Sequence, residues 1–299
     1  MAKDRRLAFL TPSFYGDFER CAFLCESLSK FVVDDFIHYL VVDRSDVSLF
    51  RDLESPTTRV IAKEDILPSW IIKVRIPLPK KGRNVRLSLK SRPVRGWHVQ
   101  QMAKLTTCAE LDHELVVMVD SDVFLTRRFE VAEVTGGGPP PLYCKPAVIT
   151  EALPRHVAWQ QTANRVLGLT APEFPSPDFI TPYNFWRPDV VRAMRQRIES
   201  VAGTDWMLVV ARNWEFCEPV VYGTFVRVEG PEASGHVLTD KPLCYSYWPH
   251  KRISNAEMAD YLAEMPDHCY AVNIQSKSEM PLDSYAHLVR GEAPRAKAS

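Results

Sequence analysis

The sequence predicts an α/β protein with a mostly parallel central sheet flanked by helices, and three observations support this. The 299 residues are 46% hydrophobic and 25% charged, which is ordinary for a globular chain with a substantial core. Short apolar runs alternate with helical patterns in the first half, as βαβ units require. A fully apolar run at 115–119 then stops at a pair of carboxylates, Asp120 and Asp122, as expected of a buried strand that ends at a ligand site.

The elements of the first half follow in order along the chain. Residues 7–10 and 36–42 are predicted to be strands, joined by a helix whose apolar residues recur at spacings of three and four. A third short strand is expected at 60–62. A helix with Trp97 on its inward face precedes the strand at 115–119. This alternation predicts sequential crossovers between parallel strands.

The run Gly136-Gly137-Gly138-Pro139-Pro140-Pro141 cannot form a helix or a central strand, and it is expected to be a hinge or surface loop near the middle of the chain. Beyond it the apolar pattern predicts further elements. Helices are expected at 151–168, 188–201 and 255–264, and strand-like runs near 142–149 and 220–228. The polar tail 291–299 is expected to be disordered.

Overall charge excludes nucleic acid as a general partner, because 37 Lys and Arg residues balance 37 Asp and Glu residues. The seven cysteines are odd in number and scattered, which predicts reduced thiols rather than disulfides. Only four apolar residues (7–10) precede Thr11, and no run approaches the about 18 apolar residues that span a membrane. These features predict a cytoplasmic protein.

One stretch departs from the overall neutrality. From Lys73 to Arg95 there are nine basic residues and no acidic one, with Pro and Gly between them, so a positively charged, loop-rich segment is expected. Two interpretations remain open. The segment is a solvated loop whose bases pair with acids elsewhere, or it contacts a donor diphosphate and a negatively charged acceptor or inner membrane face. Neutralising Lys80, Lys81 and Arg83 distinguishes the two.

The carboxylates after the apolar run at 115–119 are the sharpest chemical signal. A carboxylate at the end of a buried strand must be solvated, paired or metal-bound, because burying an isolated charge is costly. Asp120 and Asp122, one residue apart, suit a hard cation such as Mg²⁺ or Mn²⁺, which takes oxygen ligands and shares them with phosphates. The alternative is that the tripeptide with Ser121 is only a turn.

Several segments taken together resemble a little-characterised bacterial family of GT-A glycosyltransferases associated with cell-surface polysaccharide clusters. Residues 97–105, WHVQQMAKL, followed by DSD at 120–122, are similar to its W-x-x-Q-Q-x-x-K-L … D-S-D pattern. NFWRPD at 184–189 resembles its aromatic-Trp-Arg segment. EPVVYG at 218–223 is similar to its S-E-Y-x-L-Y-G motif, and IQSKS at 274–278 to its closing I-Q-S-x-S. The similarity extends over nearly the whole chain.

The resemblance implies a GT-A, Rossmann-like fold and a metal-dependent glycosyltransferase that uses Mn²⁺ or Mg²⁺. Residues 1–135 would then be the nucleotide-sugar-binding half, and 142–290 the acceptor-binding half of the same domain. The donor would be a nucleotide-diphosphate sugar, with uridine diphosphate favoured. The acceptor would be a glycan, a lipid-linked molecule or a small molecule.

The implied site residues fall into three groups. Asp122 would bind the metal directly, with Asp120 as its partner, and either His236 or His250 as a further ligand, because Tyr245 stands where the family has a histidine. Catalytic roles fall to Asp120 and to Glu218, a candidate general base. The donor would be held by early loops and one helix face: Thr11, Pro12, Ser13, Asp43, Gln101, Lys104, Asp120, Ser121 and Asp122. The acceptor would meet Trp186, Glu218 and Tyr222.

Two other functions are compatible with a carboxylate pair after a strand. Phosphatases of the haloacid-dehalogenase type use the first aspartate as a nucleophile, but they carry it on the first strand, whereas here several strands precede Asp120. A degenerate transferase that only binds a glycan or nucleotide is the non-enzymatic alternative. Hydrolysis of a nucleotide-sugar separates the three, because a transferase releases free sugar, a phosphatase releases phosphate and a binding module releases neither.

Overall fold

The computed structural model describes residues 7–76 and 83–290 and confirms the α/β class. The predicted disordered tail therefore lies outside the described residues. A central sheet of five strands has the order β11-β6-β1-β2-β3. Its strands are β1 (Leu7–Pro12), β2 (Phe36–Val42), β3 (Thr58–Ala62), β6 (Leu115–Val119) and β11 (Tyr183–Trp186). Only β11, at one edge, runs antiparallel to its neighbour.

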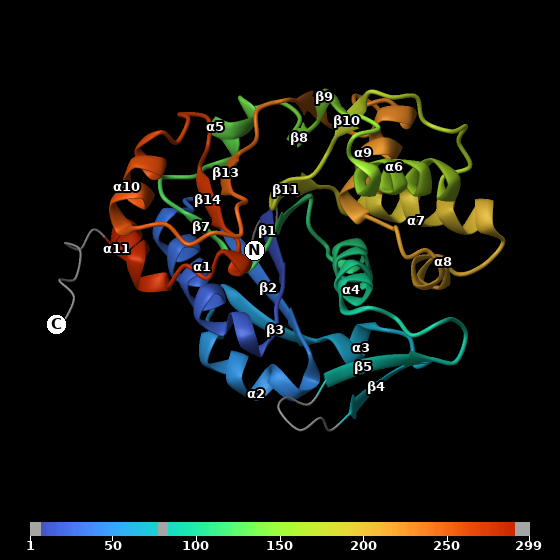
Figure 1. Cartoon of the computed structure of the whole chain (residues 1–299), viewed down its shortest axis with the longest axis horizontal. Coiled ribbons are helices and arrows are strands. Elements are labelled where there is room, and N and C mark those ends of the chain that lie inside the picture. The colour runs from blue at the N-terminus through green and yellow to red at the C-terminus, as the bar shows by residue number, and fades with distance from the viewer. Residues whose placement is uncertain (1–6, 77–82, 291–299) are drawn as a thin grey trace, which may run out of the picture.

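Helices cover both faces of this sheet, as Figure 1 shows for α1 (Phe18–Phe31) and α4 (Gly96–Glu110). Side chains alternate between the faces along each strand. Ala8 and Leu10 of β1 pack in the same cluster as α4, whereas Phe9 packs with Leu24 and Leu28 of α1. Because both faces are covered, β1 and β6 are buried throughout, which explains the apolar runs at 7–10 and 115–119.

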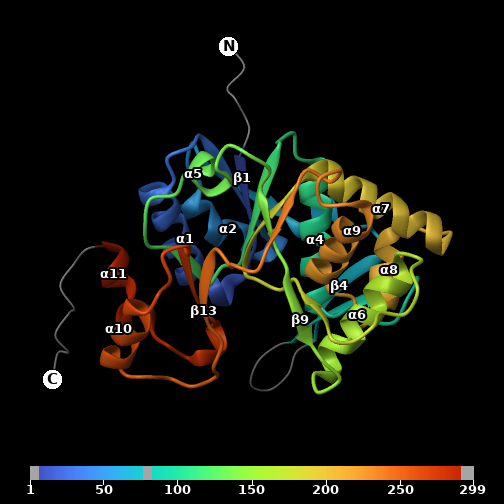
Figure 2. The ribbon, with the colours of Figure 1, turned by 90° about the horizontal axis from the view of Figure 1, so that it is seen from above.

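The second half adds a helical layer beside α4, visible from above in Figure 2. Its members are α6 (Pro154–Val166), α7 (Pro188–Ala202), α8 (Trp206–Arg212) and α9 (Glu218–Glu229). α6 and α7 confirm two of the predicted helices, and α10 (Asn255–Ala263) confirms the third. The shorter helices are α2 (Val47–Phe50), α3 (Lys63–Ile66), α5 (Val131–Thr135) and α11 (Ala286–Arg290).

The strand predicted near 220–228 is wrong, because these residues form helix α9. The helix begins at Glu218 with Pro219 in its first turn, where a missing amide hydrogen costs nothing. Neighbours bury α9 along most of its length, so its sequence shows no polar face. A short helix buried on all sides and a buried strand give the same continuous apolar run, and β-branched residues then favour the wrong choice.

The remaining strands form small sheets around the central one. A three-stranded sheet contains β7 (Val123–Leu125), β13 (Cys244–Tyr247) and β14 (Ala271–Ile274). The predicted run at 142–149 is divided between two pairs. In these, β8 (Pro141–Tyr143) joins β12 (Val237–Thr239), and β9 (Lys145–Ile149) joins β10 (Ser176–Asp178).

The basic stretch is less irregular than predicted, because it contains an antiparallel hairpin of β4 (Ile71–Ile76) and β5 (Arg83–Ser88). The prolines and glycine that suggested a loop lie mainly between the strands, at 77–82, which are outside the described residues. Lys80 and Lys81 belong to that segment. The missed signal is the alternation of apolar and basic residues along 71–76, which has the period of a strand. No described helix is long and apolar enough to cross a membrane.

Candidate functional site

The strand order reverses between β1 and β6, and this reversal positions a crevice. The chain continues from β1 to β2 and β3 on one side, and places β6 on the other. In open sheets of this kind, ligands bind outside the carboxyl ends of the strands at such a point. Leu10 of β1 pairs with Met118 of β6, so the two strands end side by side, at Pro12 and Val119.

Asp122 is held in this crevice by the small sheet. Its Oδ1 accepts a hydrogen bond from Asn273 Nδ2 at 2.8 Å, and its Oδ2 accepts one from the Ser276 amide at 3.1 Å. Burial raises the pKa of Asp122 to about 7, and the nearby charges of Asp120 and Asp17 add to the effect. The carboxylate is therefore oriented by neutral donors while its negative charge is left uncompensated.

Asp120 takes part in a different arrangement, centred on Lys104. The Lys104 ammonium lies 3.0 Å from Asp120 Oδ1 and 3.2 Å from Glu218 Oε1. The Lys104 and Glu218 side chains are 14% and 5% exposed, whereas Asp120 is 45% exposed and open to a ligand. Burial alone would lower the pKa of Lys104, but the two carboxylates raise it above its ordinary value, so the ammonium is charged at neutral pH. Burial raises the pKa of Glu218 in spite of Lys104.

Gln101 lies one helical turn before Lys104 on α4 and joins the same cluster. Its Oε1 accepts a hydrogen bond from the Glu218 amide at 2.8 Å. Its Nε2 is buried and has no hydrogen-bond partner among the residues that the structure describes. A buried amide donor without a partner is costly, so this nitrogen is a candidate contact for a ligand oxygen or an ordered water.

Asp17, which the sequence did not single out, lies at the start of α1 in the same crevice. Ser121 Oγ donates a hydrogen bond to Asp17 Oδ2 at 3.4 Å, and Arg20 lies 3.8 Å from Asp17 Oδ1. Burial raises the pKa of Asp17, and Asp120 also contributes to the increase. Asp17 is the first acidic residue after β1, and its position behind a crevice-forming strand was the available signal.

Asp43 follows β2 at the same edge of the sheet, but three bases surround it. Lys63, Lys73 and Arg86 lie 3.3, 2.9 and 2.7 Å from its carboxylate oxygens. Burial alone would raise the pKa of Asp43, but these charges lower it to about 2. Lys63 also donates to the Ser13 carbonyl oxygen at 2.8 Å, so this ion cluster joins the ends of β1 and β2 to the hairpin. Asp43, which was predicted to help hold the donor, is thus paired with three bases, and this pairing supports a structural role.

The Asp43 cluster predicts a specific pH dependence. Asp43→Asn should lower the free energy of unfolding at neutral pH, because three bases then lose their anionic partner. Since the folded pKa is about 2 against an ordinary 3.8, the stability that Asp43 contributes is present above pH 4 and is lost as the pH falls towards 2. Urea denaturation of both proteins across this range measures the difference, which should shrink on acidification. A difference that does not change with pH would contradict the ion-cluster assignment.

The loop predicted to meet the nucleotide presents backbone rather than side chains. Thr11 Oγ1 forms a hydrogen bond with His38 Nε2 at 2.8 Å, inside the sheet. The Ser13 side chain is buried, and the Ser13 amide donates to the Val41 carbonyl. Pro12 lies between them at the end of β1. These residues lie at the end of β1, beside the crevice, but the Thr11 and Ser13 hydroxyls point inward.

Three predicted site residues belong to the core instead. Trp186 and Tyr222 are buried and stack on each other, with ring centroids 4.5 Å apart, so neither ring is available to a sugar. His236 is buried as well, with Tyr222 Oη 2.8 Å from Nε2 and the Pro140 oxygen 3.2 Å from Nδ1. Burial lowers the pKa of His236 to about 4. Both ring nitrogens are engaged, which leaves none for a metal.

His250 is placed differently. It follows β13, whose last residue, Tyr247, pairs with Ile274 of β14. The Ile274 amide donates to the Asp122 carbonyl oxygen, so the segment that carries His250 leaves the small sheet at the Asp122 edge. The side chain is exposed. His250 therefore stays the candidate for a further metal ligand.

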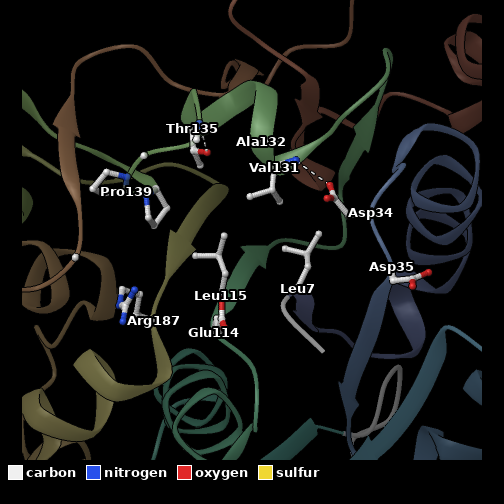
Figure 3. Close-up of a pocket in the computed structure, with 14 residues that line it drawn as sticks. Leu7, Asp34, Asp35, Glu114, Leu115, Val131, Ala132, Thr135, Pro139 and Arg187 are labelled. Carbon is white, nitrogen blue, oxygen red and sulfur yellow. Dashed lines mark hydrogen bonds between the residues drawn. The ribbon is translucent and has the colours of Figure 1, made fainter. Parts of the chain in front are cut away.

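A cavity of about 600 Å³ is lined by none of the crevice residues Asp17, Lys104, Asp120, Asp122 and Glu218 (Figure 3). Its lining includes Leu7 and Leu115, at the amino ends of β1 and β6, and the Gly137–Pro140 loop. The dashed line in Figure 3 is a hydrogen bond from the Val131 amide to Asp34. The carboxylates and the Lys104 ammonium gather instead at the carboxyl ends of the strands, so we place the functional site in the carboxyl-edge crevice.

Within the described residues, no group of three or more His, Cys, Asp or Glu side chains is arranged to hold a metal ion. The crevice does offer oxygen donors of the kind that hard cations prefer. Besides Asp120 and Asp122, Asn273 contributes a buried Oδ1 that has no hydrogen-bond partner. The donor set fits Mg²⁺ or Mn²⁺ if phosphate or water completes the coordination.

The fold and this crevice together define an α/β protein whose carboxylates and bases gather at the switch point of a mostly parallel sheet. The chain belongs to the family of unknown function DUF6492, whose model matches residues 9–291.

Two solved structures are similar at low identity. The galactosyltransferase LgtC, in complex with donor and acceptor sugar analogs, shares 10% identity over 97% of this chain and 98% of that chain, with a TM-score of 0.47. An active-site mutant of LgtC shares 10% identity over 89% and 86%, with a TM-score of 0.43. Comparison with curated proteins gave no match. At this distance the similarity does not bear on the chemistry of the site.

Proposed function

We propose that the protein is a metal-dependent glycosyltransferase that moves a sugar from a nucleotide-diphosphate donor to a glycan, lipid-linked or small-molecule acceptor. One observation carries this proposal: the Asp120-Ser121-Asp122 tripeptide follows a buried strand at the switch point and lies beside the buried Lys104–Glu218 ion pair. A diphosphate and a cation complement this mixture of uncompensated carboxylates and a fixed ammonium.

Asp120 and Asp122 would hold the cation, with His250 as a candidate further ligand. When bound, the cation would supply positive charge against the diphosphate that leaves with the nucleotide. Asp122 is suited to direct ligation because Asn273 and Ser276 already fix its orientation.

Lys104 is proposed to place a second, permanent positive charge beside the diphosphate. Its ammonium is fixed between Asp120 and Glu218, so it needs no reorganisation when charge develops on the leaving group. Gln101 Nε2 has no hydrogen-bond partner among the described residues. It is proposed to donate a hydrogen bond to an oxygen of the nucleotide-sugar in the same region. Both contacts come from α4, a helix packed in the core, which keeps them in place.

The predicted role of Glu218 as general base stays a prediction. Its burial and its pairing with Lys104 support a positioning role as well, because Glu218 connects Lys104 and Gln101 to the start of α9. The two roles differ in a measurable way. A base is needed for transfer to an acceptor and loses activity as it protonates, whereas a positioning residue also affects donor binding.

A thermal-shift screen of nucleotide-sugars with Mn²⁺ tests the proposal. A ligand that binds only the folded protein stabilises it by about 2.7 kcal/mol at 100 times its dissociation constant. We expect a uridine diphosphate sugar to raise the melting temperature only when Mn²⁺ or Mg²⁺ is present. If only guanosine or cytidine diphosphate sugars stabilise the protein, the proposed uridine donor is wrong. If no nucleotide-sugar stabilises it, the proposed function is contradicted.

The products of slow hydrolysis separate the alternatives. Free sugar with nucleoside diphosphate supports the transferase, and inorganic phosphate supports a phosphatase of the haloacid-dehalogenase type. Metal-dependent binding without any turnover, even with acceptors, supports a binding module.

A further inference from the structure

The β4–β5 hairpin has two chemically different faces. In an antiparallel pair, residues directly opposite each other point to the same side, and the side alternates along the strands. Lys73 lies opposite Arg86, while Ile72 lies opposite Leu87 and Val74 opposite Val85. Lys73 and Arg86 therefore lie on one face of the hairpin, and Ile72, Val74, Val85 and Leu87 lie on the other.

Ion pairs decide which face is turned inward. Lys73 and Arg86 both bind Asp43, at the carboxyl end of β2, so their face lies against the body of the protein. Figure 1 shows the hairpin at the periphery, next to α3 and away from the small sheet of β7, β13 and β14. The aliphatic face is consequently the outward one.

The outward face is exposed to an unusual degree for aliphatic residues. Leu89, which continues the β5 pattern beyond the strand, is 76% exposed. Leu87, Ile72 and Val74 are 45%, 44% and 36% exposed. We call Ile72, Val74, Val85, Leu87 and Leu89 the hairpin face. A row of large aliphatic side chains on a water-exposed protein surface marks a contact site.

Positive charge and an indole ring border the hairpin face. Lys90, Arg92 and Arg95 follow it in the chain and are exposed. The Arg95 guanidinium lies 3.9 Å from the centroid of the Trp214 ring, which is itself 40% exposed. The sequence from 71 to 97 contains no acidic residue. The whole surface therefore combines aliphatic, aromatic and cationic groups.

We propose that the hairpin face docks on a lipid bilayer that contains anionic lipids. Aliphatic side chains enter the acyl boundary, an indole favours the headgroup level, and Lys and Arg attract anionic headgroups. A second copy of the chain is a poorer occupant. A symmetric pair would bring the basic borders of the two copies together without acids from this segment to balance them.

The position of the hairpin face gives bilayer docking a role in catalysis, and this role rests on the proposed function. The hairpin is tied through Asp43 to the same edge of the sheet as Asp120, so a docked bilayer would lie on the side of the crevice. A lipid-linked acceptor could then reach the crevice without leaving the membrane. Binding to vesicles, however, requires neither nucleotide nor activity, so the two proposals fail separately.

Vesicle cosedimentation with the full chain tests the docking. We expect the protein to bind vesicles of equal parts phosphatidylglycerol and phosphatidylcholine, and to bind pure phosphatidylcholine vesicles at least about tenfold more weakly. The triple variant Ile72→Thr, Leu87→Thr, Leu89→Ser should lose at least about tenfold in binding to the anionic vesicles. Salt should weaken binding without abolishing it, because only the charge attraction is screened, over about 10 Å at 0.1 M.

A matched triple variant, Val201→Thr, Val228→Thr, Val237→Thr, removes exposed aliphatic surface elsewhere and should bind as the parent does. If the hairpin triple variant fails to fold, Leu89→Asp alone serves, since that side chain is the most exposed. The proposal is overturned if the parent does not bind anionic vesicles, or if hairpin variants bind as tightly as the parent. A dimer seen by light scattering that the hairpin variants abolish would assign the face to a second copy instead.

Discussion

Asp122→Asn should abolish the manganese-dependent binding of a uridine diphosphate sugar and reduce its hydrolysis by at least about 100-fold. Removing one fixed electrostatic group from an active site costs about 10²–10³ in rate, and here the group removed is the proposed metal ligand itself. The fold should survive. The side chain of the new asparagine keeps one oxygen, which can accept a hydrogen bond from Asn273 or from Ser276. Removing the charge also relieves repulsion from Asp120 and Asp17.

Isothermal titration with and without Mn²⁺ and a hydrolysis assay measure this effect. Asp112→Asn is the matched control, because Asp112 is exposed near the opposite, amino-terminal end of β6 and should leave both unchanged. Losing one neutral hydrogen bond costs about 1 kcal/mol, so the melting temperature should move by only a few degrees. Retention of both metal-dependent binding and turnover in Asp122→Asn would remove the basis of the proposed function.

Lys104→Met is expected to lower the free energy of unfolding by about 3 to 5 kcal/mol, the usual cost of removing one partner from a buried ion pair. The cost arises because Glu218, 5% exposed, loses its only described cationic partner, and Asp120 loses the same charge. Urea denaturation of the parent and the variant at pH 7 measures it. Lys145→Met, an exposed lysine on β9, should change stability little.

The effect of Lys104→Met should also depend on pH. Burial holds the pKa of Glu218 above 4.5 even beside Lys104, and removing Lys104 raises it further. The penalty is therefore full when Glu218 is ionised, and it diminishes as the pH falls and the carboxyl protonates. Adding Glu218→Gln to Lys104→Met should recover part of the lost stability. The two changes should then show a coupling energy of the size expected for residues in contact. Additive losses in the double variant would show that the pair is not coupled.

The parts of the fold that the sequence could predict are those with an unambiguous pattern. The apolar run at 115–119 admits a strand and little else, since a carboxylate pair ends it after five residues. The helices around 154–166 and 188–202 have polar faces that set their period. Helix α9 has none, because neighbours bury it along most of its length, and its β-branched residues therefore predicted a strand.

The β4–β5 hairpin is a part of the fold that the local sequence did not predict. Its prolines and bases predicted a loop, and local composition could not reveal that Asp43, some 30 residues earlier, would bind Lys73 and Arg86 and fix one face inward. Charge pairing across the chain depends on where the strands end in space. The exposed hairpin face follows from that pairing and could not be read from the segment alone.

The sequence by itself determined the class of fold and the position of the central carboxylates, because strand periodicity and the cost of burying charge act locally. Only the tertiary structure decided the partners of those carboxylates. It brought Asp17, Asn273 and Glu218 to Asp120 and Asp122, and it stacked Trp186 and Tyr222 in the core, away from any sugar. Contacts between residues so far apart in the sequence are set by how helices and sheets pack, and sequence spacing carries no record of them.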